Sequence, residues 1–364
     1  MLIYYFPLIL IFLSYCILFS NKKEVNILFY FFLGTVIIIL CGFRVNSDVD
    51  YGPYIGLFNE TPKLTSLTRE ILSQLYGEVG YLYFTSVVKE IGLSFVAVTI
   101  TFSTFSVITK MYFIRKFCRQ NYAAITFSLY LCFCFITVEF IELRWSLASG
   151  LTALSIYYSL QNYYFRNLIF VAIAGLFHYF SLAFIFVFAL RIVSLKQSIL
   201  IFISCFVIAL FYKFFSIDFF IAIESELFIV TRFLRYVNEI ESSLGLFSYL
   251  KCLMYFAVFL IFIKLFSLSD QEEKMIKTSL VLLSFSLFIS FVPLLFYRSM
   301  VISDLVNITT MLMLLGNSHF KKSEELLICT IFTLLFATWF YFDVTNYIEA
   351  DRIYNYKSWF MEVF

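Results

Sequence analysis

Charged residues are scarce in this sequence. Of its 364 residues, only 14% are Asp, Glu, Lys or Arg, whereas 62% are hydrophobic. A soluble domain of this size could not cover its surface with so few polar side chains. Apolar runs of about 20 residues, the length that crosses a bilayer, recur along the chain. Because these runs do not alternate between apolar and polar residues as barrel strands do, the sequence predicts an all-α polytopic integral membrane protein.

Several motifs that mark common enzyme classes are also missing. The 4 prolines and 11 glycines form no linker and no phosphate-cradling loop, and no HExxH motif, basic tract or internal repeat is visible. The 8 cysteines include no CxxC pair and fall mostly inside apolar runs, which is typical of small buried hydrophobic residues. We therefore expect one transmembrane domain over residues 1–364, without a nucleotide cofactor, a metal or a nucleic-acid partner.

The distribution of basic residues predicts how the chain crosses the membrane. Segments dense in Lys and Arg are expected on the cytoplasmic side, and they lie at Lys22, Arg115, Lys274 and Lys321. A single crossing at 168–190 would place the later basic loops on the outer side of the membrane. We therefore expect two short helices there that meet near His178 and return to the side from which they started. The resulting topology has about ten full transmembrane helices plus this broken, re-entrant pair. Two larger outer loops are expected at 44–77 and 216–247.

Arginines gather on the expected outer side, where a positive charge opposes insertion. A guanidinium binds phosphate or carboxylate through two parallel hydrogen bonds, so this set suits a lipid-linked diphosphate. The alternative is ordinary pairing with outer carboxylates, Arg44 with Asp48 or Asp50 and Arg144 with Glu142. The candidate diphosphate ligands are Arg44, Arg144, Arg232, Arg235 and Arg298.

Three acidic or imidazole groups are candidates for a general base. Asp50 follows Asp48 by two residues, and Glu142 follows Glu139 by three, which would place the second pair on one face of a helical turn. His178 lies within an apolar run, where an ionisable residue is rare and points to function. Asp50, Glu142 or His178 could accept a proton from a sugar hydroxyl. Solvated loop carboxylates and a structural histidine are the alternatives.

Tyrosine and small residues complete the pattern. Outer tyrosines could stack on sugar rings, although tyrosine is also common at membrane interfaces; they are Tyr51, Tyr54, Tyr76, Tyr81 and Tyr236. Residues 78–90 are expected to form a short interfacial helix.

After Arg144, the residues Ser146, Gly150 and Ala153 recur at helical spacing, which allows close approach between two helices.

Five short motifs of this sequence together resemble the EpsG-like branch of the Wzy-type O-antigen and capsular polysaccharide polymerases. They cover about residues 40–190, and Arg298 resembles the Arg that starts a late span. Trp145 stands where a Gln is expected, and Asp48 is an additional acid. The matching residues are Arg44, Asp50-Tyr51, Glu78-Val79-Gly80-Tyr81, Arg144 with Ala148, and His178 with Ser181.

The resemblance implies a glycosyltransferase in the bacterial inner membrane. It would move a glycan from undecaprenyl diphosphate onto a lipid-linked repeat unit at the periplasmic face, with inversion and without a cofactor. Tyr51, Glu78 and Tyr81 would contribute to sugar binding. Membrane lipid and a chain-length regulator protein are the other expected partners. The main rival is a flippase of lipid-linked oligosaccharide, which usually has two similar halves and a charged path through the membrane.

Overall fold

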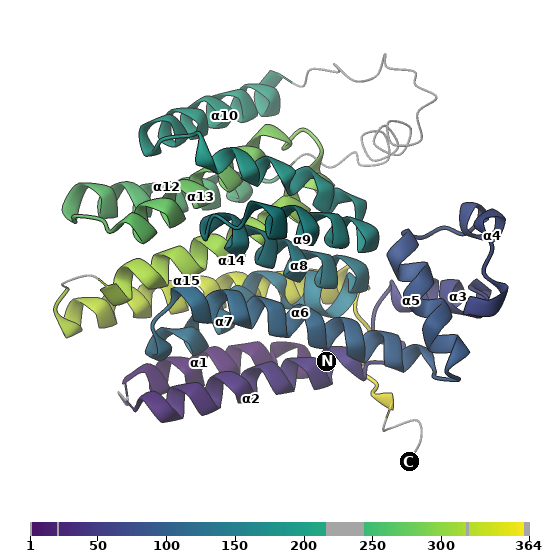
Figure 1. Cartoon of the computed structure of the whole chain (residues 1–364). Coiled ribbons are helices and arrows are strands. Elements are labelled where there is room, and N and C mark those ends of the chain that lie inside the picture. Colours follow the sequence, from purple (N-terminus) through teal and green to yellow (C-terminus); the bar gives the residue numbers. More distant parts are fainter. Residues whose placement is uncertain (1, 20–21, 216–243, 318–319, 360–364) are drawn as a thin grey trace. The chain divides into compact units, whose positions relative to one another are not determined.

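The computed structural model describes residues 2–19, 22–215, 244–317 and 320–359. Within these ranges every regular element is a helix (Figure 1). The chain forms two compact units. Unit 1 comprises Met1–Phe188 and Leu315–Phe364, and unit 2 comprises Ala189–Leu314. The expected arginines Arg232 and Arg235, together with Tyr236 and most of the expected outer loop 216–247, lie outside the described residues.

Unit 1 holds most of the helices. Its long members are α1 (Phe6–Phe19), α2 (Lys23–Gly42), α6 (Phe95–Phe117), α7 (Gln120–Cys134), α8 (Leu143–Leu160), α9 (Tyr164–Phe177) and α15 (Lys322–Glu349). The shorter ones are η1 (Leu2–Tyr5), α3 (Tyr51–Glu60), η2 (Leu64–Ser66), α4 (Arg69–Gln74), α5 (Val79–Glu90), the π-helix η3 (Phe135–Ile141) and the 3₁₀ helix η4 (Tyr179–Arg191), whose last residues fall in unit 2.

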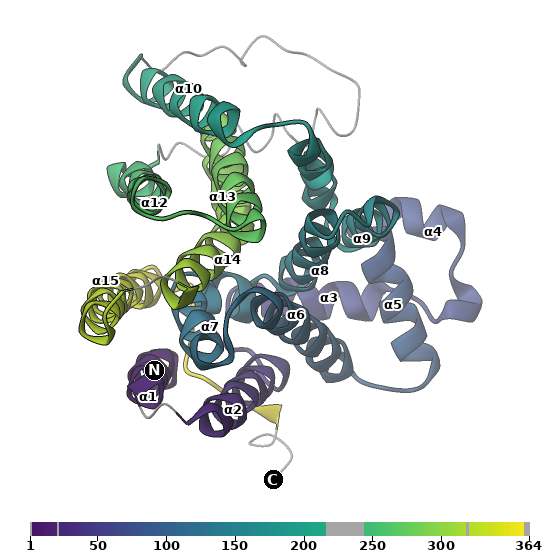
Figure 2. The ribbon, with the colours of Figure 1, turned by 60° about the vertical axis from the view of Figure 1, so that its left-hand side comes forward.

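The packing of unit 1 places α8 between two neighbours. Helix α8 packs against α6 on one side and α9 on the other, while α7 contacts α1, α2 and α15 (Figure 2). Gly150 permits the α6 contact, because a Cβ at that position would lie 2.2 Å from the Thr109 hydroxyl. This is the close approach that the small residues of this helix predicted.

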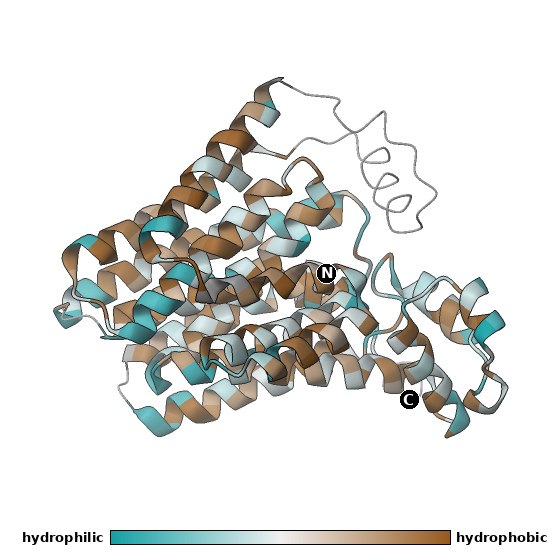
Figure 3. Ribbon diagram, turned by 45° about the horizontal axis from the view of Figure 1, so that its top comes forward, coloured by the Kyte–Doolittle hydropathy of each residue, from teal (hydrophilic) through white to brown (hydrophobic). Residues whose placement is uncertain are grey.

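Seven of the described helices are long and apolar enough to cross a membrane, which identifies a multi-pass membrane protein. These helices are mostly hydrophobic, with hydrophilic residues at several helix ends (Figure 3). The expected count of about ten is not confirmed. Helices α1 and α9 have only 14 residues each, α8 is rich in Ser and Thr, and α13 (Asp270–Phe288) opens with a charged turn. The seven spans are Lys23–Gly42, Phe95–Phe117, Gln120–Ile141, Leu195–Phe214, Leu246–Leu265, Pro293–Asn317 and Lys322–Glu349.

The break expected at His178 is present. Helix α9 ends just before it, His178 has extended backbone angles (φ −155°, ψ 112°), and η4 begins at the next residue. The two helices fold back on one another, because the Phe188 ring near the end of η4 lies 5.2 Å from the Tyr164 ring at the start of α9. The pair therefore returns to the side from which it started.

The expected outer loop 44–77 is structured. It contains α3, η2 and α4, and the expected interfacial helix follows as α5. With α3 and α4, α5 lies beyond one end of α2 (Figure 1). A stretch near the C-terminus pairs with the start of this loop: Val45 N donates to Lys357 O at 2.9 Å, and Tyr354 N donates to Ser47 O at 2.9 Å. The Tyr4 hydroxyl donates to the Ser47 and Tyr354 carbonyls, so three distant segments are joined here.

Unit 2 contains α10 (Leu195–Phe215), α12 (Leu246–Leu265), α13 and α14 (Pro293–Asn317), whose last residues belong to unit 1. Helix α13 packs against α10, and its hydroxyl groups bond to α14, as in the 3.1 Å contact between Ser286 and Ser303. Lys251 forms a buried ion pair with Asp304 at 2.6 Å. Arg298 lies on α14 and belongs to unit 2, whereas the other described candidate residues belong to unit 1.

Candidate functional site

An open pocket of about 360 Å³ lies in unit 1, between α3 and the first turn of α8. It is large enough for one sugar unit by comparison with the usual size of ligand sites. The pocket combines carboxylates, aromatic rings and one guanidinium. Its lining residues are Asp50, Pro53, Tyr54, Gly56, Leu57, Glu60, Tyr76 and Arg144.

Arg144 is the cation of this pocket. Its Nη1 donates to the Glu78 carboxylate, and its guanidinium lies over the Tyr54 and Tyr81 rings, 5.4 and 5.7 Å from their centroids. The side chain is 18% exposed, and its buried Nε has no hydrogen-bond partner among the described residues. Since the helix N-terminus also carries a partial positive charge, the start of α8 is favourable for an anion.

Glu78 owes its position to α5. It caps the N-terminus of α5 without a side-chain hydrogen bond to that helix, so its carboxylate is directed to Arg144 instead. Helix α5 packs closely on α9 at Gly80, where a Cβ would lie 2.8 Å from Leu176. The Glu-x-Gly-Tyr pattern thus has three structural roles: an ion pair, a close helix contact and a ring beside the guanidinium.

His178 contacts Trp145, the residue that follows Arg144. The Trp145 ring centroid is 5.0 Å from that of the imidazole. The backbone N–H of Phe180 donates to His178 Nδ1 at 3.3 Å. In the neutral imidazole, this bond leaves the proton on Nε2, so Nε2 is a donor in this tautomer.

The two carboxylate candidates lie near Tyr54. Asp50 precedes α3 and lines the pocket, while Glu142 precedes α8. Burial raises the pKa of Tyr54 above its ordinary value of 10.0; Arg144 opposes this shift, and Asp50 and Glu142 add to it. The structure therefore brings Asp50, Glu78, Tyr81, Glu142 and Arg144 into one region.

Arg44 has a different role from the one its residue type first indicated. It is 1% exposed, its Nε donates to Asp48 at 2.8 Å, and its Nη atoms donate to the Cys41 and Ile141 carbonyls at 2.9 and 3.3 Å. The other oxygen of Asp48 accepts from the backbone N–H of Asp50 at 3.0 Å. Arg44 is thus committed to internal partners, which was the alternative interpretation, and it fixes the loop that carries Asp50.

Two further residues depart from the expected pattern. Tyr51 is 3% exposed and its ring packs edge-on against Phe95 at 5.4 Å, so its ring belongs to the hydrophobic core rather than to a sugar-stacking surface. Glu139 does not share an outer face with Glu142. The π-helix turns Glu139 inward, where it pairs with Lys110 of α6.

The sequence reasoning missed Lys110 and the C-terminal pairing stretch. Lys110 precedes the basic turn at Arg115 and carries no local signal of burial, yet it is 0% exposed. Tyr54 and Tyr76 were recognised only as members of the outer tyrosine set, although both line the pocket. In the part of the chain that the structure describes, no three His, Cys, Asp or Glu side chains gather closely enough to hold a metal ion.

The fold and the site identify a multi-pass helical membrane protein whose pocket is lined by α3 and by Arg144 at the start of α8. The family follows from comparison with known proteins. Residues 27–358 match the EpsG family, and the chain belongs to that family. Neither a curated protein nor a solved structure matches it.

Proposed function

We propose that the protein is a polysaccharide repeat-unit polymerase. It transfers a glycan from undecaprenyl diphosphate onto a lipid-linked repeat unit at the periplasmic face of the bacterial inner membrane. Membership of the EpsG family supports a role in polysaccharide metabolism. The observation that carries the proposal is Arg144, which lines a sugar-sized pocket at a helix N-terminus and lies over two adjacent tyrosine rings.

Arg144 fits the leaving group of this reaction. When the bond between the anomeric carbon and the diphosphate breaks, negative charge develops on the diphosphate oxygens. A fixed guanidinium near a helix N-terminus stabilises that charge without having to reorient. The diphosphate remains on its undecaprenyl carrier as it departs. Arg232, Arg235 and Arg298 remain proposed diphosphate ligands, whereas Arg44 holds the loop.

Asp50 is the proposed general base. The acceptor hydroxyl forms the new bond to the anomeric carbon and loses its proton, which must go to a nearby base. Of the three candidates, Asp50 is the one that lines the pocket with Arg144. His178 in the tautomer set by Phe180 is a donor at Nε2 and therefore suits a diphosphate oxygen better than a hydroxyl proton. Glu142, whose charge also raises the pKa of Tyr54, is the other carboxylate proposed for this role.

The remaining partners follow from the same reaction. Tyr54 and Tyr76 line the pocket and would shape the space for the sugar rings, and Tyr76 is 61% exposed and accessible for stacking. Tyr81 is 0% exposed, so with Glu78 it would support Arg144 rather than touch a sugar. The polyprenyl tails would lie in the membrane lipid beside the helices. A chain-length regulator protein is a further proposed partner.

The test is deletion of the gene in its host, with the surface polysaccharide run on a gel. Complementation uses the wild type, Arg144→Ala, Asp50→Asn and Lys274→Ala. Lys274→Ala is the control: Lys274 pairs with Asp270 in a solvated ion pair 2.7 Å long, and losing this pair should cost less than about 1 kcal/mol. This variant should therefore restore the long ladder fully. Arg144→Ala and Asp50→Asn should leave core plus a single repeat unit.

Two results would contradict the proposal. If deletion removes all surface glycan and traps lipid-linked repeats at the inner leaflet, the protein is a flippase. If Arg144→Ala, present at wild-type amounts, restores the long ladder, then the pocket is not the polymerase site. A purified enzyme that lengthens lipid-linked repeat units in nanodiscs would confirm the reaction directly.

A further inference from the structure

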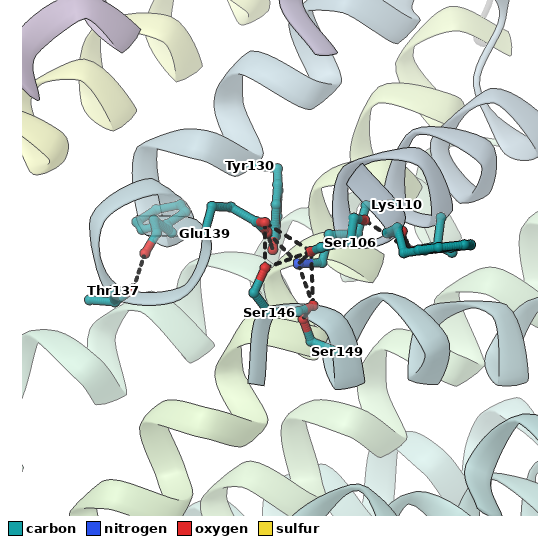
Figure 4. A network of polar contacts seen from close by, with 10 residues as sticks. Ser106, Lys110, Tyr130, Thr137, Glu139, Ser146 and Ser149 are labelled. Carbon is teal, nitrogen blue, oxygen red and sulfur yellow. Dashed lines mark hydrogen bonds and ion pairs between the residues drawn. The ribbon is translucent and has the colours of Figure 1, made fainter. Parts of the chain in front are cut away.

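Lys110 and Glu139 form a buried ion pair among α6, the π-helix and α8 (Figure 4). Their side chains are 0% and 1% exposed. Burying two charges costs several kcal/mol, and the attraction offsets this cost only when all their hydrogen bonds are satisfied. A pair of this kind is therefore weak evidence for stability alone, and its surroundings indicate what else it does.

The hydrogen bonds of the pair are complete. Lys110 Nζ donates to Glu139 Oε1, to Ser106 Oγ at 2.8 Å and to the Ser146 carbonyl at 3.2 Å, which uses all three ammonium protons. Glu139 Oε1 also accepts from Tyr130 at 3.0 Å, and Oε2 accepts from Ser106 at 2.9 Å and Ser146 at 2.8 Å. The four acceptor positions of the carboxylate are thereby filled.

These bonds converge on the first turn of α8. Ser146 is held at two atoms: its hydroxyl donates to Glu139, and its carbonyl accepts from Lys110 at 3.2 Å. The serine lies two residues after Arg144 and four after Glu142. A shift of this turn would move the Arg144 guanidinium away from Glu78 and the pocket.

We propose that the Lys110–Glu139 pair is a positioning element that holds the first turn of α8 and so keeps Arg144 aimed at the pocket. The effect of the pair on catalysis rests on the proposed function, whereas its effect on the position of Arg144 does not. Neither residue touches the pocket, so both act through Ser146 and Arg144. The π-helix matters because it brings Glu139 inward while leaving Glu142 at the start of α8.

The geometric part is tested by the fluorescence of Trp145, which lies between Arg144 and Ser146 and is 1% exposed. The chain has three tryptophans, so Trp339→Phe with Trp359→Phe leaves Trp145 as the reporter. In this background the full-length protein in nanodiscs receives Lys110→Met with Glu139→Leu, which replaces the charges by apolar groups of similar volume. Acrylamide quenching should rise several-fold, with the helix content unchanged.

Ser14→Ala with Ser128→Ala is the matched control. It removes a buried hydroxyl contact of 2.7 Å between α1 and α7, elsewhere in unit 1, and should leave Trp145 quenching unchanged. If the double apolar variant does not fold, Ser106→Ala removes the hydroxyl that accepts from Lys110 and donates to Glu139, which loosens the pair beside Ser146 and should raise quenching in the same direction. Unchanged quenching in a folded variant would overturn the proposal.

The catalytic part is tested by a double-mutant cycle. In the otherwise wild-type enzyme, Arg144→Lys should lower the rate of chain extension about tenfold, because the planar guanidinium is lost. In the Lys110→Met/Glu139→Leu background the same change should cost less than about threefold, since Arg144 is no longer aimed. Additive effects would show that the pair only stabilises the fold. If Arg144→Lys has no effect in either background, the proposed function fails, while the fluorescence still reports on the positioning.

Discussion

Arg144 and Glu78 form an ion pair between the first turn of α8 and the start of α5, although 66 residues separate them in the sequence. The pair is asymmetric in exposure: Glu78 is 7% exposed at its side chain and Arg144 is 18% exposed. The carboxylate therefore lies behind the guanidinium, which faces the pocket. Glu78 orients the cation, and Arg144 presents it to a ligand.

Glu78→Gln should lower the rate of chain extension by roughly ten- to a hundredfold. The change removes a charge-assisted hydrogen bond, which contributes about 1.5–3 kcal/mol, and releases Arg144 from its fixed direction. Chain extension by purified enzyme measures the effect. Glu70→Gln on α4 is the control, because Glu70 is exposed and should have no influence. Equal rates for the two variants would show that the ion pair does not serve the reaction.

The ring and the hydroxyl of Tyr54 should make separate contributions to the rate of chain extension. Tyr54→Phe keeps the ring beneath the Arg144 guanidinium and should cost only a few-fold in rate, whereas Tyr54→Ala removes a cation–π contact of about 0.5–2 kcal/mol as well. Because burial raises the pKa of Tyr54 above its ordinary value of 10.0, the hydroxyl stays protonated up to about pH 10. The wild-type rate should therefore show no step between pH 8 and about 10 from this group. A larger loss in Tyr54→Phe than in Tyr54→Ala would contradict the assignment.

Much of the candidate site could be predicted because its chemistry lies in short local patterns. Arg144 and Tyr81 were found from residue type and expected loop position, and Glu78 from the resemblance that the Glu-x-Gly-Tyr pattern carries. His178 interrupts an apolar run, and the chain breaks there. In each case the side chain is unusual for its surroundings, and a membrane protein retains such residues mainly at functional positions.

The rest depends on partners that are distant in the chain. Lys110 meets Glu139 across 29 residues, and no neighbour of either residue predicts the encounter. The spacing of Glu139 and Glu142 predicts a shared face only for an α-helix, and the π-helix removes that relationship. Ser47 pairs with Lys357 across 310 residues. Hydropathy patterns describe single helices, so they cannot show which distant segments pair.

Acidification should release the loop that precedes α4. The Glu90 carboxylate accepts from the backbone N–H and hydroxyl of Thr65 at 3.2 and 3.1 Å. These bonds hold the pKa of Glu90 below its ordinary value of 4.5. A lowered pKa means that the bond stabilises the loop above pH 4.5 and that this contribution is lost as the pH falls through the folded-state pKa.

Limited proteolysis of residues 61–68 should therefore become faster in the wild type only below about pH 4.5. Glu90→Gln should be cleaved at the faster rate at every pH, because it lacks the carboxylate. Thr65→Val should be cleaved at an intermediate rate and keep part of the pH dependence, since it removes the hydroxyl donor but keeps the backbone N–H. A wild-type rate that is independent of pH down to 3 would contradict the anchoring role of Glu90.

The last prediction separates a structural Arg44 from a ligand-binding one. Asp48→Asn keeps the acceptor for the Asp50 N–H but leaves the Arg44 charge buried without a counterion, which should destabilise the protein by about 3–5 kcal/mol. Arg44→Met with Asp48→Asn removes both charges and should regain most of that stability, measured by thermal unfolding in nanodiscs. If Arg44 only fixes the loop, the double variant should also regain most of its chain extension. A double variant that is stable but inactive would instead place Arg44 on the diphosphate, and since its guanidinium is 1% exposed, the loop would have to open when substrate binds.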